Sequence, residues 1–157
     1  MDIRQSARAI LINNKNEILL FKFKFENIKG ENTLWVTPGG GVEEGENFEQ
    51  ALKRELFEEI GLKLNSIGPW IWTKEVIFKG KERDFVSYER YYLIKMDNTD
   101  ISFDNMTLNE VRTLKGFKWW DVNELLSSTE EFSIPQIGKL LLEIIEGNIP
   151  KNPIIIS

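Results

Sequence analysis

The 157-residue sequence contains no cysteine and no histidine. Without cysteine, a disulfide framework, a thiolate zinc site and a cysteine nucleophile are excluded. Without histidine, a Ser-His-Asp triad, an imidazole metal site and a histidine general base are excluded as well. Any chemistry must therefore use carboxylates, lysines, hydroxyls and backbone groups. Any metal must be a hard cation bound by oxygen atoms, such as Mg²⁺, Mn²⁺ or Ca²⁺.

The sequence also lacks a run of 18 apolar residues and an excess of basic residues. The first absence predicts that no segment spans a membrane, and residues 1–4 lack the apolar core of a signal peptide. With 25 acidic and 20 basic residues, the net charge is −5, which argues against a dedicated nucleic-acid binder. We therefore expect a cytoplasmic protein, and the length predicts a single domain over residues 1–157.

Apolar stretches separated by turn signals predict an α/β protein with a mixed sheet and helices on its faces. Strands are expected at residues 6–12, 17–23, 33–37, 70–78, 85–96 and 114–120, the first two joined as a hairpin. Residues 25–32 are expected to form a polar surface loop, and residues 79–81 to lie in a connection between strands. Residues 38–41, Pro-Gly-Gly-Gly, are expected to be neither a helix nor a central strand.

Three helices are expected. The clearest one covers residues 48–60, with Asn47 and Gln50 as a capping box at its start and Gly61 at its end. Asp121 with Glu124 can cap a short helix that ends at residue 126. Residues 133 and 136, a serine and a glutamine, can cap a last helix, which the glycine at 147 and the proline at 150 would close.

The first of these helices carries a stripe of negative charge. At 3.6 residues per turn, Glu55, Glu58 and Glu59 share one face. The adjoining face is apolar and is expected to pack on the sheet; it consists of Leu52, Leu56 and Ile60. Like charges at this spacing destabilise a helix by roughly 0.2–0.5 kcal/mol per pair. From the charge pattern alone, two interpretations stay open: a solvated acidic face, or a site where a divalent cation turns the repulsion into coordination.

A run of three glycines, Gly39, Gly40 and Gly41, lies shortly before this acidic stripe. Glycine lets the backbone adopt positive φ and approach a ligand closely. Backbone carbonyls there can bind a hard cation, and backbone amides can donate to a phosphate. A glycine run that leads into an acidic helix favours the cation interpretation over a plain turn.

The segment from Gly40 to Leu62 resembles the Nudix box, G-x5-E-x7-R-E-U-x-E-E-x-G-U, in which U is aliphatic. The matching residues are Gly40, Glu46, Arg54, Glu55, Leu56, Glu58, Glu59, Gly61 and Leu62. Three further segments are similar to the family as well. They are the N-terminal hairpin, the sequence Trp-Val-Thr-Pro-Gly-Gly at residues 35–40, and the sequence Lys-Trp-Trp-Asp-Val-Asn-Glu-Leu at residues 118–125. The resemblance implies an α/β/α sandwich around a mixed sheet. It also implies hydrolysis of a nucleoside diphosphate linked to another moiety, by attack of water on phosphorus.

The resemblance also implies roles for the box residues. Glu55, Glu58 and Glu59, with the carbonyl of Gly40, would bind Mg²⁺ or Mn²⁺. Arg54 would orient a box carboxylate, and the glutamate at 46 would stabilise the junction between loop and helix. The general base differs among family members, and the candidates here are three carboxylates: Glu58, Glu55 and Glu110.

Less follows for the substrate and the partners. Arg8 and the glycine amides of residues 39–41 can contact phosphates, and Trp35 can stack on a base. A small nucleotide, such as a nucleoside triphosphate or a nucleotide sugar, is the expected substrate. A catalytically silent domain that binds a nucleotide is the alternative, and a calcium-binding module ranks last because no EF-hand loop is present. The chain is expected to be a monomer or a homodimer, and the isoleucines at 154–156 can join an edge strand, contact a partner or fray.

Overall fold

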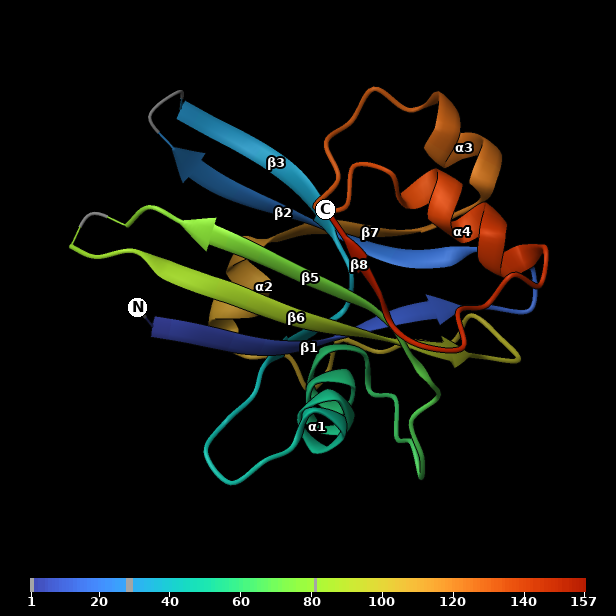
Figure 1. Cartoon of the computed structure of the whole chain (residues 1–157), viewed down its shortest axis with the longest axis horizontal. Coiled ribbons are helices and arrows are strands. Elements are labelled where there is room, and N and C mark those ends of the chain that lie inside the picture. The colour runs from blue at the N-terminus through green and yellow to red at the C-terminus, as the bar shows by residue number, and fades with distance from the viewer. Residues whose placement is uncertain (1, 28–29, 81) are drawn as a thin grey trace.

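Two parallel strands, β1 (Asp2–Ile12) and β6 (Phe85–Lys95), form the centre of a mixed sheet (Figure 1). The structure is a computed structural model that describes residues 2–27, 30–80 and 82–157. The other strands are β2 (Ile18–Asn27), β3 (Gly30–Val36), β4 (Gly39–Gly41), β5 (Trp70–Phe78), β7 (Leu114–Trp120) and β8 (Ile154–Ile156). The helices are α1 (Phe48–Ile60), α2 (Leu108–Thr113), α3 (Val122–Ser127) and α4 (Ile137–Ile145).

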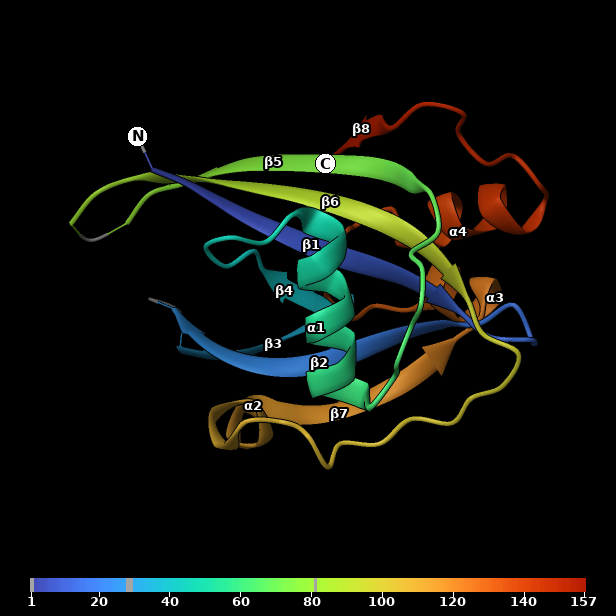
Figure 2. The same cartoon turned by 90° about the horizontal axis from the view of Figure 1, so that it is seen from below.

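The strands run in the order β3-β2-β1-β6-β5-β8, with β4 paired to β1 and β7 paired to β2. The predicted hairpin of β1 and β2 is present, and its two strands pair where Ile12 faces Ile18. Beyond that point β2 separates from β1 and pairs with β3 and β7. Figure 2 shows the result, a sheet whose two halves diverge at one end, with β4 between them and α1 crossing both.

Side chains alternate along the central strands and so build a core on each face of the sheet. Ala7, Ala9 and Leu11 of β1 face α1 and pack with its apolar stripe. Ile10 and Ile12 point to the other face, where α3 and α4 provide the cover. The predicted α/β/α sandwich with a central mixed sheet is therefore confirmed.

Helix α1 has the predicted bounds, and its capping box is present. The side chain of Asn47 accepts from the backbone N–H of Gln50, and the side chain of Gln50 accepts from the backbone N–H of Asn47. Gly61 ends the helix in the left-handed conformation, with φ 69°, as predicted for a glycine at this place. The apolar stripe is buried as expected; it consists of Leu52, Leu56 and Ile60.

Two expected irregular segments are strands instead. Residues 25–32 are not a surface loop, because β2 continues to Asn27 and β3 begins at Gly30. This edge hairpin is held by backbone hydrogen bonds, so its polar composition does not prevent pairing. The glycines of residues 39–41 form the short strand β4 against β1. The expected strand-connecting residues 79 and 80 lie between β5 and β6, and residue 81 falls outside the described part of the chain.

Two helix starts also differ from expectation. The last helix, α4, begins at Ile137 rather than after Ser133, and Gln136 makes no capping hydrogen bond through its side chain. The backbone N–H of Ser133 instead donates to the carbonyl of Trp35, which joins this segment to β3. Helix α2 was not expected, although Thr107 and Glu110 form a complete capping box at its start. The short helix α3 is capped by Asp121 and Glu124 as predicted.

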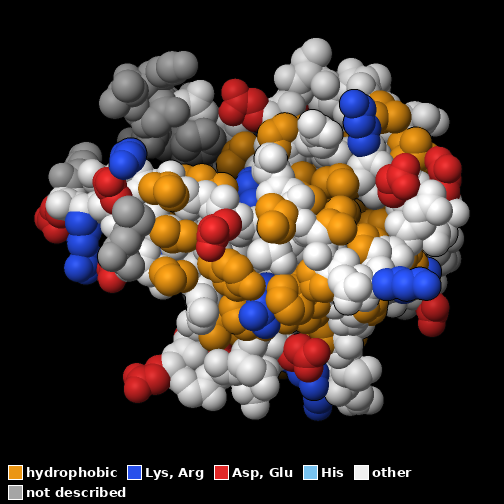
Figure 3. All heavy atoms as spheres, viewed as in Figure 1, with side chains coloured by type: hydrophobic (Ala, Val, Ile, Leu, Met, Phe, Trp, Pro, Cys, Tyr) orange, Lys and Arg blue, Asp and Glu red, His pale blue; other side chains and the backbone are white. Residues whose placement is uncertain are grey.

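The isoleucines of residues 154–156 join the edge of the sheet, where β8 pairs in parallel with β5. This corresponds to one of the three alternatives that the sequence left open. Figure 3 shows apolar side chains on the face of the molecule that Figure 1 presents. Exposed apolar residues in β5 and β8 include Ile77, Phe78, Ile154 and Ile155. Among the described residues, none of the helices has the length and apolarity that crossing a bilayer requires.

Candidate active site

Arg54 joins helix α1 to the segment that precedes it. Its guanidinium donates two hydrogen bonds to the carboxylate of Glu46, at 2.8 and 2.9 Å, and one to the carbonyl of Gly41, at 2.9 Å. It also donates to Glu55 at 3.0 Å and to Glu58 at 3.4 Å. The hydrogen bonds that Arg54 donates to Glu46 raise the pKa of Arg54, so this cation stays charged. Paired, forked contacts of this kind hold a carboxylate in one orientation.

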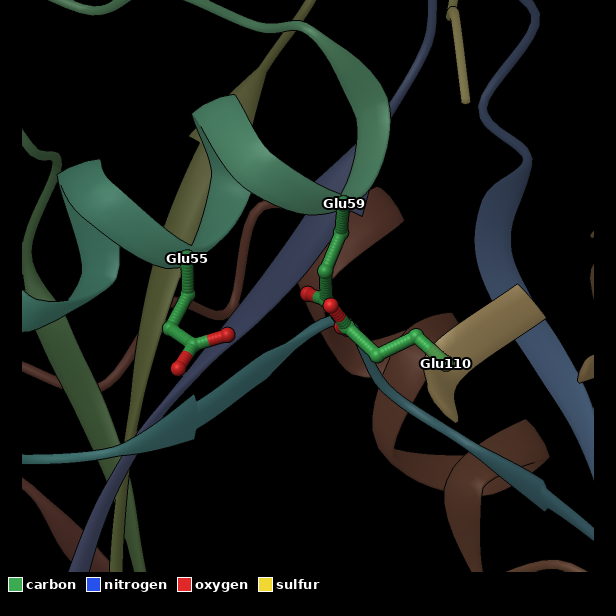
Figure 4. A group of neighbouring side chains, drawn as sticks. All are labelled: Glu55, Glu59 and Glu110. Carbon is green, nitrogen blue, oxygen red and sulfur yellow. The ribbon is translucent and has the colours of Figure 1, made fainter. Parts of the chain in front are cut away.

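Three carboxylates meet beside this arginine. Glu55 and Glu59 come from α1 and Glu110 comes from the first turn of α2, and one oxygen of each lies within 4.8 Å of the others (Figure 4). We call these residues the carboxylate cluster. In Figure 4 the side chains of Glu59 and Glu110 point toward one another, while Glu55 lies one helical turn away on the same face of α1. Three hard oxygen donors from two helices suit a divalent cation such as Mg²⁺.

Glu59 is the most deeply placed member of the carboxylate cluster. Glu59 is only 4% exposed, and its Oε1 accepts a hydrogen bond of 2.7 Å from the backbone N–H of Gly39. Burial raises the pKa of Glu59 to about 8, and the neighbouring carboxylates of Glu55 and Glu110 also raise it. The hydrogen bond from Gly39 and the positive charge of Arg8 lower this pKa. Burial also raises the pKa of Glu55, against the opposing effect of Arg54. Burial therefore disfavours the charged forms of Glu55 and Glu59, and a bound cation would stabilise them.

The glycine segment fits closely against this cluster. A Cβ atom at residue 40 would lie 2.5 Å from the carboxylate of Glu55, so no larger residue fits while Glu55 keeps its place. At Gly39, with φ 131°, a Cβ atom would lie 2.2 Å from the carbonyl oxygen of Ala7. Only glycine allows this approach. The residues present therefore fit a hard cation, because three carboxylates converge where the glycine backbone passes closely.

Glu58 lies apart from the carboxylate cluster. Its side chain is 37% exposed and receives a hydrogen bond from Arg54, and it is not among the three residues whose oxygens converge. The sequence predicts Glu55, Glu58 and Glu59 on one face of the helix. Side chains on one face can still have different neighbours, and here Glu58 contacts Arg54 instead of the other two members of that face. Metal binding by Glu58 stays a prediction, as does its role as general base.

The predicted substrate residues have different surroundings. Arg8 donates to Glu89 and to the carbonyls of Thr37 and Gly39. Trp35 is 7% exposed and packs against Trp120 with ring centroids 5.1 Å apart. Its rings therefore form part of the core. Substrate binding by Arg8, Trp35 and the glycine amides of residues 39–41 stays a prediction.

A separate hollow of about 590 Å³ opens at the first turn of α1. Its lining includes Phe48, Trp70 and Arg90, and the Arg90 guanidinium lies 4.1 and 4.0 Å from the centroids of these two rings. No member of the carboxylate cluster lines this hollow. It is therefore not the place where the cluster would act.

Two residues near the site were not assigned structural roles from the sequence. Glu110 was a candidate general base, but no helix was expected there, although the Thr-x-x-Glu spacing of residues 107–110 is itself a signal for a helix start. Glu89 was not a candidate at all, because a lone glutamate in a strand carries no recognisable pattern. Only the pairing of β1 with β6 brings it to Arg8.

Comparison with known proteins identifies the family of this chain. A family model described as NUDIX domain matches residues 2–140. The chain is 28% identical over 165 residues to an RNA pyrophosphohydrolase of Wolbachia pipientis, covering 94% of both chains. It is 36% identical over 87 residues to the nucleoside triphosphatase NudI of Escherichia fergusonii, covering 54% of this chain and 60% of that one. The solution structure of the E. coli ORF135 protein superimposes with a TM-score of 0.65 at 20% identity, covering 93% and 91%. The chain therefore belongs to the Nudix family of pyrophosphohydrolases.

Proposed function

We propose that this protein is a metal-dependent hydrolase that cleaves a pyrophosphate bond in a small nucleotide by attack of water on phosphorus. The observation that carries the proposal is the carboxylate cluster, in which oxygens of Glu55, Glu59 and Glu110 lie within 4.8 Å of one another. A pyrophosphate carries several negative charges, so carboxylates alone would repel it. A cation bound between them reverses the local sign.

The carboxylates of the cluster and the carbonyl of Gly40 are the groups that would hold Mg²⁺ or Mn²⁺, with Glu58 as a further ligand. When bound, such a cation neutralises phosphate charge and lowers the pKa of an attacking water. The protein's own residues orient this site. The N–H of Gly39 holds Glu59 at 2.7 Å, and Arg54 holds Glu55 at 3.0 Å. The general base is one of three carboxylates: Glu55, Glu58 or Glu110.

The proposed substrate is a nucleoside triphosphate, a nucleotide sugar or a similar small nucleotide. The net charge of −5 supports a small ligand over a long polyanion. The name of NudI, nucleoside triphosphatase, agrees with this choice. The name of the Wolbachia relative makes the 5′ end of a triphosphorylated RNA a second candidate. Arg8 and the glycine amides of residues 39–41 are the proposed phosphate contacts. A contact of Trp35 with the base would use the 7% of this residue that is exposed.

The test is an activity panel with purified protein and Mg²⁺ or Mn²⁺. The substrates are nucleoside triphosphates, ADP-ribose, nucleotide sugars, dinucleoside polyphosphates and a short triphosphorylated RNA. We expect turnover of at least one small nucleotide, and loss of that turnover with EDTA. Preferential cleavage of the RNA would favour the second candidate.

Paired variants test the role of the helix. Glu58→Gln and Glu59→Gln together should abolish turnover, because both carboxylates of the last turn are then neutral. Turnover that survives this double change would contradict the metal-dependent mechanism. Nucleotide binding without any turnover in the unmodified protein would instead support the alternative, a catalytically silent domain that binds a nucleotide and acts as a regulatory module.

A further inference from the structure

An ion pair between two central strands lies next to the carboxylate cluster without belonging to it. The Nε of Arg8, on β1, donates to the Oε2 of Glu89, on the adjacent strand β6, at 3.0 Å. The other carboxylate oxygen of Glu89 accepts from the hydroxyl of Tyr91 at 3.2 Å. The side chains of Arg8 and Glu89 are 24% and 17% exposed. Both oxygens of Glu89 are thus engaged, and its carboxylate holds the guanidinium in one orientation.

The other end of the Arg8 guanidinium contacts the glycine segment. Its Nη1 donates to the carbonyl oxygens of Thr37, at 3.1 Å, and Gly39, at 3.2 Å. The carbonyl of Pro38, which lies between them, accepts from the backbone N–H of Ala9 at 2.8 Å. Three consecutive peptide groups are therefore each held by a donor from β1.

The middle one of these three peptide groups is the one that contacts the cluster. It joins Pro38 to Gly39, and its N–H donates to Glu59 at 2.7 Å. Because a peptide group is planar, the direction of this N–H is set by the carbonyl on its other side and by the two neighbouring peptides. Gly39 has φ 131°, a conformation that the backbone does not favour for most residues, so it depends on outside contacts to persist.

We propose that Arg8 and Glu89 are positioning residues for the carboxylate cluster. Glu89 orients Arg8, Arg8 holds the glycine segment, and that segment directs the Gly39 N–H at Glu59. This inference rests on the proposed function, since it concerns the same cation site. It differs from a phosphate contact by Arg8, because it assigns a role to Glu89, whose negative charge would repel a nucleotide.

Two substitutions separate positioning from charge. Arg8→Lys keeps the positive charge but loses the planar fork that reaches the carboxylate and both carbonyls. Glu89→Gln keeps the size of the side chain and removes the charge that orients Arg8. Changes to residues that orient a metal ligand typically reduce metal affinity or activity about 10–100-fold. We expect Arg8→Lys to raise the dissociation constant for Mn²⁺ about tenfold and Glu89→Gln to raise it at least about threefold.

The measurement is Mn²⁺ binding to the nucleotide-free protein, followed by electron paramagnetic resonance, with kcat and KM for the nucleotide that the unmodified protein cleaves fastest. In Glu89→Gln the kcat should fall with the Mn²⁺ affinity while KM stays within about twofold, because no substrate contact is assigned to Glu89. The double variant should lose no more than the larger single loss, because both residues act through one contact. Asp84→Asn is the matched control, since it breaks another ion pair, Lys79–Asp84 at 2.9 Å, at the start of β6.

The outcomes are distinguishable. Unchanged Mn²⁺ affinity in both single variants, with the unmodified protein active, would overturn this inference and leave the proposed function standing. A lower KM in Glu89→Gln with unchanged Mn²⁺ affinity would do the same, because it would show only removal of a repelling charge. Absence of both Mn²⁺ binding and turnover in the unmodified protein would overturn the proposed function and this inference with it. Melting temperatures of all variants identify any that fail to fold.

Discussion

Neighbouring glutamates in the last turn of α1 have very different surroundings. Glu59 is buried, receives the Gly39 N–H and faces two other carboxylates. Glu58 is partly exposed and is bound by Arg54. The difference arises because one residue along a helix rotates the side chain by about 100°, enough to turn it from the glycine segment toward solvent. The carboxylate cluster is therefore defined by residue-level contacts rather than by acidic content.

Gly40→Ala tests the close fit of the glycine segment. The added Cβ atom would lie 2.5 Å from the Glu55 carboxylate and would displace it, while the backbone needs no positive φ at this residue. We expect the fold to persist, and the rate of pyrophosphate hydrolysis to fall by about tenfold or more, because a 1 Å misplacement can cost about 10²-fold. Steady-state kinetics and circular dichroism measure the two properties.

Gly116→Ala is the control for this substitution. A Cβ atom at residue 116, in β7, would meet no atom within 4 Å. Its activity should match that of the unmodified protein. Equal activity of Gly40→Ala and Gly116→Ala would show that the fit between Gly40 and Glu55 is not needed for catalysis.

At the scale of elements, α1 connects the core with the site. One face packs Leu52, Leu56 and Ile60 against the sheet, and the adjoining face presents the carboxylates. A capping box and a C-terminal glycine define where the helix begins and ends. The packed face holds the helix rigidly, and rigid placement of ligands is what a site of this kind requires.

Leu56→Ala should destabilise the protein strongly. Leu56 is 0% exposed, so the change removes buried methyl groups and leaves a cavity, at a cost of about 2–5 kcal/mol in the free energy of unfolding. Phe57→Ala is the matched control on the next residue, where the side chain is 46% exposed and the expected loss is below about 1 kcal/mol. Urea unfolding measures both. Similar losses for the two variants would contradict the packing of α1 described above.

At the scale of the whole molecule, the site lies where the two halves of the sheet diverge. The β1–β6 half contributes Arg8 and Glu89, β4 contributes the glycines, and α2 brings Glu110 across to α1. The carboxylate cluster therefore exists only in the folded chain, because α1 and α2 are separated by two long strands in the sequence. A cation that binds the cluster should bind the folded protein and not the unfolded one.

Divalent cations should therefore raise the melting temperature. A ligand at about 100 times its dissociation constant stabilises the folded state by about 2.7 kcal/mol, which corresponds to several degrees for a chain of this size. We expect this shift with Mn²⁺ or Mg²⁺ in a thermal scan, and no shift with NaCl at equal ionic strength. The variant Glu55→Gln with Glu59→Gln should lose the shift. A shift that persists in this variant would place the bound cation elsewhere.

The sequence alone was sufficient to predict α1, its caps, its buried stripe and the family, because these depend on spacing within a short segment. It was also sufficient to exclude thiolate and imidazole chemistry, since those residues are absent. Only the tertiary structure brought Glu110 to Glu59, set Glu58 apart, and joined Glu89 to Arg8. These contacts link residues that are distant along the chain, and strand pairing and helix packing decide them rather than any local pattern. The absence of cysteine and histidine therefore defined which atoms could form the site, and the fold decided which glutamates meet.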